Sequence, residues 1–153
     1  MLFVIEKDSV AGFIYDNNYY FYIKDVLGTI REVIDKDGVV KCSYDYTPFG
    51  KVINSSGDIT LLDINDILFK GYVYDKETQL FYCNSRYYSP ELCRFISPDS
   101  IEYLDPQSIN GLNLYCYCIN NPIMYADPSG HFAISIFLIG LAASWVISSI
   151  ASY

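Results

Sequence analysis

The chain has 153 residues, enough for one ordinary domain with a core of its own. Its formal net charge is −8, and its ten basic residues are scattered rather than clustered. A protein that binds nucleic acid needs a basic stripe, and an anionic membrane surface repels an acidic body, so we expect neither partner for the main part of the chain. Sixteen Tyr and nine Phe instead favour half-buried β surfaces.

The first 70 residues alternate short aromatic or β-branched runs with turn signals. Residues 12–25, GFIYDNNYYFYIKD, predict two strands joined by a turn, and Asp37-Gly38 between β-rich flanks predicts a second hairpin. Tyr-Asp dipeptides recur about every thirty residues, which indicates stacked hairpin repeats. They fall at 15–16, 44–45 and 74–75. The stretch 61–70, LLDINDILFK, fits either a short helix or a strand.

The following 61 residues are richer in turn residues. Residues 71–88, GYVYDKETQLFYCNSRYY, predict another hairpin. Pro90 and Pro98 bound a short strand at 93–96, CRFI, because proline fixes φ and donates no hydrogen bond. Apolar residues at alternate positions of 111–122, GLNLYCYCINNP, predict one further strand.

Cysteine and histidine usage argues against a metal site. None of the five cysteines forms a CxxC pair and the only histidine is His131, so we expect neither a zinc site nor a complete disulfide framework. Cys116 and Cys118 share one face of the predicted strand and are expected to be small buried residues. No phosphate loop or HExxH motif occurs, so we expect no cofactor, no small-molecule substrate and no diffusible multi-turnover enzyme.

The last 22 residues, 132–153, carry no charge. About twenty helical residues span the hydrocarbon core of a bilayer. Small residues recur at every fourth position, as in membrane helices that pack closely. They are Gly140, Ser144, Ser148 and Ser152. We expect an apolar C-terminal helix that inserts into a membrane, lies buried, or opens a longer domain. The N-terminus has no basic segment, so a signal peptide is not expected.

Three motifs in the second half resemble the core segment of the bacterial Rhs (rearrangement hotspot) family, the YD-repeat polymorphic toxins. They are RYYxPExxRFIxPD at 86–99, GLNLYxYCxNNP at 111–122 and DPSG at 127–130. Residues 20–52 are similar to the last YD repeats that precede this segment. The resemblance covers roughly residues 12–131.

The resemblance implies a mainly β fold of antiparallel hairpins. Family members are much longer, and their repeats wind into a hollow shell that encloses a C-terminal toxin, with the core segment at the end where the cargo begins. Interbacterial competition through secretion systems is the usual setting, which implies a secreted or cell-surface bacterial protein. We expect terminal YD hairpins at 1–70, the core segment at 71–131 and the apolar helix at 132–153. The expected partners are a C-terminal toxin, the remainder of a larger shell and, through the helix, a membrane.

Many family members also cleave themselves just after the DPxG motif, by aspartyl-type chemistry. Such hydrolysis needs one protonated and one ionised carboxyl group close together. Asp99 matches the family position assigned to the protease, and Asp105 and Asp127 are candidates for its partner. The resemblance implies that the scissile bond is the peptide bond between His131 and Phe132.

Three residues depart from the usual family pattern. They are Ser89 where Asp is common, Cys93 where Gly is common, and His131 where Leu is usual. An Asp beside Pro also caps its own turn, so Asp99 is either a structural corner or a catalyst. Three functions follow as hypotheses: a shell and core that encapsulates or presents an effector, a single-turnover self-cleaving module, and a carrier of a membrane-inserting helix. Since a shell needs many repeats, we expect this chain to be either the C-terminal remnant of a larger gene or a displaced orphan cassette.

Overall fold

The computed structural model shows two compact units, Met1–Phe81 and Tyr82–Tyr153, which are described one at a time. The residues that the structure describes are 1–6, 9–107, 111–131 and 133–135. The strands of both units pair antiparallel, as the sequence predicts, and turns and irregular chain connect the short strands of the second unit.

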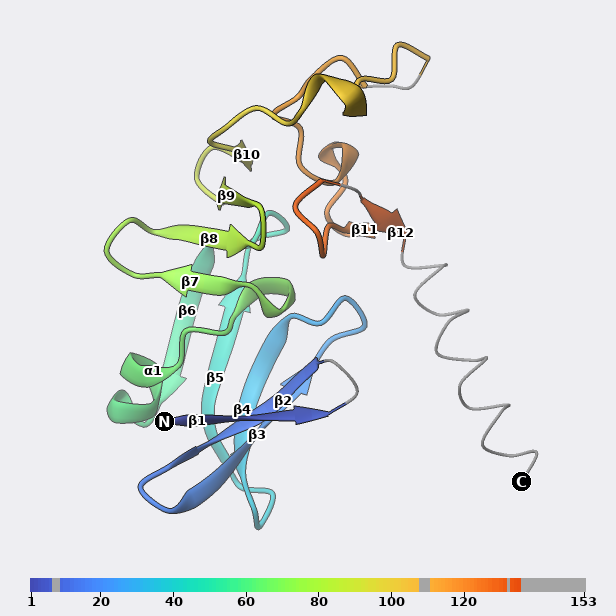
Figure 1. The fold of residues 1–153 in the computed structure, drawn as a ribbon. Coiled ribbons are helices and arrows are strands. Elements are labelled where there is room, and N and C mark those ends of the chain that lie inside the picture. Colours follow the sequence, from blue (N-terminus) through green and yellow to red (C-terminus); the bar gives the residue numbers. More distant parts are fainter. Residues whose placement is uncertain (7–8, 108–110, 132, 136–153) are drawn as a thin grey trace, which may run out of the picture. The chain divides into compact units, whose positions relative to one another are not determined.

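The first unit contains a six-stranded antiparallel sheet in which each strand pairs with the next along the chain (Figure 1). Its strands are β1 Leu2–Glu6, β2 Ser9–Tyr15, β3 Asn18–Lys24, β4 Ile30–Asp35, β5 Val40–Tyr46 and β6 Val52–Gly57. Both predicted hairpins are confirmed, as β2–β3 and β4–β5. Asp16 and Asn17 have φ of 47° and 60° and Gly38 has φ of +79°, the left-handed backbone that tight hairpin turns require.

One face of this sheet carries the aromatic core. Phe13 on β2 and Ile30 and Val33 on β4 are fully buried, and β3 lies between these two strands. Phe13 stacks on the cross-strand ring of Tyr20 with 5.1 Å between ring centroids. On β3, Tyr22 is buried and Tyr20 and Lys24 are half-buried, while the residues between them are exposed, which fits the period of two along a strand with one face against a core.

The segment that the sequence assigns to neither helix nor strand contains both a helix and a tight turn. α1, Ile59–Ile64, lies beside β5 and β6 (Figure 1). Asp58 begins it as N-cap, and its carboxylate accepts hydrogen bonds from the backbone of Thr60 and Leu61. A 3₁₀ turn, η1 Phe69–Gly71, follows, with φ of 51° at Lys70.

A buried amide joins this segment to the sheet. Asn65 is 1% exposed. Its Nδ2 donates to the Tyr44 hydroxyl at 3.1 Å and to the Ile67 carbonyl at 3.2 Å, and its Oδ1 accepts from the Tyr22 hydroxyl at 2.7 Å. Burial raises the pKa of Tyr44 to about 12 and also raises the pKa of Tyr22, so both hydroxyls stay protonated at neutral pH.

A four-stranded antiparallel sheet has the order β10-β9-β8-β7. Its strands are β7 Val73–Asp75, β8 Leu80–Cys83, β9 Arg86–Ser89 and β10 Arg94–Phe95. The hairpin predicted within 71–88 is therefore confirmed as β7–β8. The strand predicted at 93–96 forms over two residues only, because Cys93 has φ of 57° and ends the extended run.

The strand predicted at 111–122 is wrong. Asn113 accepts a hydrogen bond from the backbone of Tyr115, which turns the chain, and residues 118–120 all have positive φ. These residues form a 3₁₀ turn, η3 Cys118–Asn120, and only an isolated bridge from Cys116 to Arg94 remains of a strand. A second such turn, η2, covers Ile101–Tyr103.

The helix predicted over 132–153 does not begin where the sequence places it. Ile134–Ser135 forms β12, which pairs antiparallel with β11, Tyr125–Ala126, and this pairing holds the backbone extended. The rest of the predicted helix, with Gly140, Ser144, Ser148 and Ser152, lies outside the described residues, and so does Phe132. Within the described ranges, no helix has both the length and the apolar character to cross a membrane. The predicted boundaries after residues 70 and 131 stay predictions.

Candidate functional site

All three candidate carboxylates line one cavity of about 300 Å³ in the second unit. Asp99 follows β10, Asp105 follows η2 and Asp127 follows β11, so three segments distant in the sequence supply them. His131, the residue before the predicted scissile bond, lines the same cavity. The structure therefore brings together the described residues that the sequence singles out for cleavage.

Arg86, the first residue of β9, links two of these carboxylates. Its Nη2 lies 2.8 Å from Asp99 Oδ2 and 4.0 Å from Asp127 Oδ2, and its side chain is only 6% exposed. Its guanidinium carbon lies 3.7 Å from the ring centroid of Phe95. Burial lowers the pKa of Arg86, while Asp99 and Asp127 act in the opposite direction. One buried guanidinium thus faces two buried carboxyl groups and pairs most closely with Asp99.

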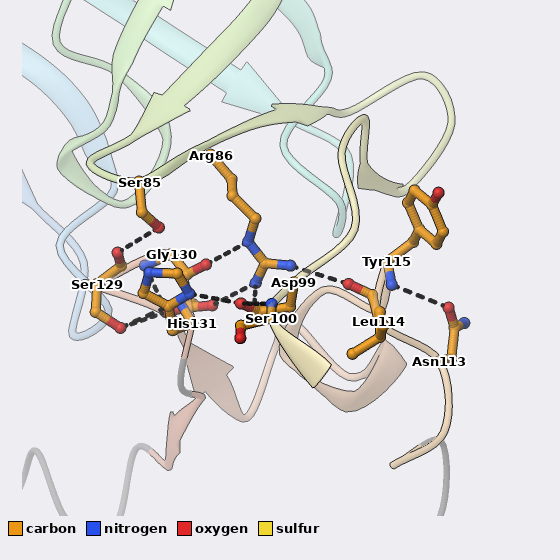
Figure 2. Close-up of polar contacts among 11 residues, drawn as sticks. Ser85, Arg86, Asp99, Ser100, Asn113, Leu114, Tyr115, Ser129, Gly130 and His131 are labelled. Atoms are coloured by element: carbon orange, nitrogen blue, oxygen red, sulfur yellow. Dashed lines mark hydrogen bonds and ion pairs between the residues drawn. The ribbon is translucent and has the colours of Figure 1, made fainter. Parts of the chain in front are cut away.

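The guanidinium also ties the backbone of the unit together. Nη1 donates to the Leu114 carbonyl at 3.0 Å, and Nε donates to the Gly130 carbonyl (Figure 2). The Leu114 carbonyl also accepts from the backbone N–H of Asp99 at 2.9 Å. One side chain therefore fixes three separate chain segments.

Asp99 combines the two roles that the sequence leaves open. Its Oδ1 accepts from the backbone N–H of Ser100 at 2.8 Å, which is the turn-capping contact of a structural corner. The same oxygen lies 2.6 Å from Nδ1 of His131. Asp99 is therefore a corner residue whose buried carboxylate also lines the cavity.

Asp127 is enclosed by its own turn. Its Oδ1 accepts from the backbone N–H groups of Gly130 at 2.8 Å and His131 at 3.1 Å, and from the Ser129 hydroxyl at 3.2 Å. This carboxylate therefore shapes the DPSGH turn and holds the N–H of the residue before the predicted scissile bond.

Asp105 differs from the other two candidates because it is exposed. Its Oδ1 accepts from the backbone N–H of Gln107 at 3.0 Å, an Asx-type turn contact. Its backbone N–H donates to the Gly111 carbonyl at 2.9 Å. Asp105 thus borders the cavity from a solvent-facing turn.

Three consecutive side chains hold three consecutive carbonyls of the DPSG segment. Asn84 Nδ2 donates to the Pro128 carbonyl at 2.6 Å, and Ser85 Oγ donates to the Ser129 carbonyl at 2.9 Å. Arg86 Nε donates to the next carbonyl, that of Gly130. The turn between β8 and β9 therefore grips residues 128–130, and Figure 2 shows the contacts of Ser85 and Arg86 with Ser129 and Gly130.

His131 is held by its ring as well as by its backbone. The imidazole stacks on the Tyr103 ring, with 5.0 Å between centroids and 10° between planes. The backbone N–H of His131 donates to Asp127. The sequence does not predict this contact of Tyr103, because an aromatic residue in a turn-rich segment does not by itself indicate which residue it packs against.

The described residues contain no group of three or more His, Cys, Asp and Glu side chains placed to hold a metal ion. All five cysteines are free thiols, with Cys42, Cys83 and Cys118 buried and Cys93 and Cys116 half-buried. Burial raises the pKa of Cys116, which also lines the cavity. The polar chemistry of the cavity therefore centres on carboxylates, Arg86 and His131.

Comparisons with known proteins place this chain in a family. Residues 3–123 match the family described as Teneurin YD-shell. The tRNA3(Ser)-specific nuclease WapA of Bacillus spizizenii is 34% identical over 138 residues, which cover 90% of this chain and 6% of that protein. Salivary gland surface protein 1 of Aedes aegypti is 33% identical over 135 residues, which cover 88% of this chain and 4% of that protein.

A solved structure agrees with these matches. The Tc holotoxin pore of Photorhabdus luminescens superimposes with a TM-score of 0.71 at 27% identity, covering 79% of this chain and 5% of that chain. The chain thus spans between 4% and 6% of the length of these three proteins. The family match covers most of the chain, and the chain belongs to the teneurin YD-shell family, the YD-repeat family to which its Rhs-like motifs point.

Proposed function

We propose that this chain is a structural core of a YD-repeat shell that fixes the polypeptide at the point where a C-terminal effector begins. The grip of residues 84–86 on the carbonyls of 128–130 carries the proposal. A shell that encloses or presents a C-terminal segment needs a fixed exit point for the chain, and this contact supplies one.

The strength of this anchor comes from its charged centre. A hydrogen bond to a charged group contributes about 1.5–3 kcal/mol, roughly twice a neutral one. Arg86 donates to Gly130 and Leu114 and also pairs with Asp99 and, at longer range, with Asp127. Pulling residues 128–130 away therefore leaves buried charges with fewer partners, which is costly in a low-dielectric interior.

The first unit supports the larger partner that this function requires. Within the described residues, β1 and β6 are the two end strands of the sheet. Leu2 and Ile5 of β1 are 71% and 70% exposed. Edge strands with exposed apolar side chains pair readily with further strands, as stacked repeats require. The expected partner on this edge is the remainder of the shell.

A segment exchange tests the proposal. In the tRNA nuclease WapA of Bacillus subtilis, which is 35% identical to this chain over 124 residues, the matching segment is replaced by this chain's sequence. We expect a chimera that resists limited proteolysis as the parent does. The same chimera with Arg86→Met serves as control and should be cut within the exchanged segment. Equal sensitivity of both chimeras to the protease contradicts the proposal.

A second candidate is one self-cleavage between His131 and Phe132, and the cavity shared by Asp99, Asp127 and His131 favours it. In this reaction Asp99 takes a proton from a water molecule whose oxygen bonds to the His131 carbonyl carbon. The C–N bond to Phe132 then breaks, and the proton passes to the departing nitrogen. The products are a carboxyl group on His131 and an amino group on Phe132. Asp127 holds the His131 amide in place.

Intact mass spectrometry of the full chain beside Asp99→Asn tests this candidate. We expect the wild-type chain to form, slowly, a species that ends at His131, and the variant to keep its full mass. The amide of Asn keeps the size of the side chain but cannot act as the base. Cleavage at the same rate in both chains excludes Asp99-dependent self-cleavage.

A further inference from the structure

We propose that His131 is a latch on the candidate self-cleavage: its ring occupies Asp99, so that the residue before the scissile bond restrains the group that would cut it. The proposal rests on the second candidate function. It names His131 as the residue that restrains Asp99, and it predicts which substitution of His131 removes this restraint.

Asp99 already serves three donors. Oδ2 lies 2.8 Å from Arg86 Nη2, while Oδ1 accepts from the Ser100 N–H at 2.8 Å and lies 2.6 Å from His131 Nδ1. An ionised carboxylate can only accept hydrogen bonds, so the latch takes Nδ1 of His131 as the donor of the third contact. Both oxygens are thus engaged, as Figure 2 shows around Asp99.

The ring is held in this position by other contacts. It stacks on Tyr103 at 5.0 Å, and the N–H of the same residue donates to Asp127. The His131 side chain is 34% exposed, whereas the Asp99 side chain is 6% exposed. The carboxylate therefore faces the cavity beneath a partly exposed ring that must leave before water can take its place.

The contact matters because a general base must lie within hydrogen-bond reach of the water that it deprotonates. Three groups contact the Asp99 carboxylate. Arg86 and the Ser100 N–H stabilise the turn at Asp99, whereas His131 is the residue before the scissile bond. Removing the His131 donor frees one acceptor position of Asp99 and leaves the other two contacts in place.

Leu and Asn are matched replacements for His131. They have nearly the same size, but Leu has no donor, whereas the Asn amide places an N–H where Nδ1 of the imidazole lies. Full-length wild type, His131→Leu, His131→Asn and His131→Leu with Asp99→Asn are followed by intact mass. We expect His131→Leu to form the product ending at residue 131 about tenfold or more faster than wild type, since the lost bond is charge-assisted. His131→Asn, which keeps a donor, should form this product more slowly than His131→Leu, and the double variant should keep its full mass.

The outcomes separate the two proposals. Equal rates for wild type and His131→Leu overturn the latch and leave self-cleavage standing. Equally fast cleavage in His131→Leu and His131→Asn also overturns the latch, because the donor is then not the restraint. Full mass in every chain overturns both the latch and the self-cleavage.

Discussion

The Arg86→Met variant is expected to lose about 3–5 kcal/mol of free energy of unfolding in the second unit, the usual effect of removing one partner of a buried ion pair. Met fills a similar volume but leaves Asp99 and Asp127 buried without a compensating charge. It also removes the donors to the Leu114 and Gly130 carbonyls. Urea unfolding, followed by hydrogen exchange of peptides from residues 82–131, measures this loss.

Arg94→Met is the matched control. Arg94 is exposed, and its guanidinium carbon lies 4.3 Å from the ring centroid of Tyr115. We expect a loss of about 1 kcal/mol or less, as for exposed cation–π contacts. Adding Asp99→Asn to Arg86→Met should recover part of the lost stability, because it removes one unpaired buried charge. Similar losses for the two arginines would mean that the buried network does not hold the unit.

Gly130→Ala is expected to be the second most damaging substitution. Gly130 has φ of +79°, and a Cβ there would lie 2.3 Å from both the Cys83 carbonyl oxygen and Ser85 Oγ. A left-handed backbone costs a residue with a Cβ roughly 1–2 kcal/mol, and forced overpacking adds typically about 1–3 kcal/mol. The alanine must therefore push residues 128–130 away from the turn that grips them.

Gly38→Ala separates the two causes. Gly38 has the same φ of +79°, but no atom lies within 4 Å of the position of its Cβ. We expect a loss of about 1–2 kcal/mol in the first unit from backbone strain alone. Each variant is compared with wild type by urea unfolding, with hydrogen exchange reporting on each unit. A loss at Gly130 no larger than at Gly38 would contradict the close packing of the DPSG segment.

The hairpins could be predicted from sequence because turn chemistry is local. Asp37-Gly38 marks the β4–β5 turn, and the Asp-Asn pair after Tyr15 marks the β2–β3 turn. The strand expected at 111–122 failed because alternation of apolar residues is a weaker signal than the turn made by Asn113 and the positive φ of Cys118. The pairing of Ile134–Ser135 with β11 has no local signal at all.

Some residues of the candidate site could also be predicted from the sequence, and others could not. Asp99, Asp127 and His131 could be named from motifs, and the structure places all three around one cavity. Arg86 stands within a quoted motif, but its partners lie 13, 28, 41 and 44 positions away, so no spacing rule reveals its role. Residues 82–131 hold Arg86 and Arg94 beside three Asp, and a buried charged residue is usually paired, but nothing local shows which arginine is buried.

Hydrogen exchange at the backbone amides of Gly130 and His131 tests the central claim most directly, since both amides donate to the buried carboxylate of Asp127. In the wild-type chain we expect both amides to exchange far more slowly than in an unstructured peptide. In Arg86→Met we expect that protection to be lost. Fast exchange of both amides in the wild-type chain, or unchanged protection in Arg86→Met, would contradict the anchor at the exit of the core.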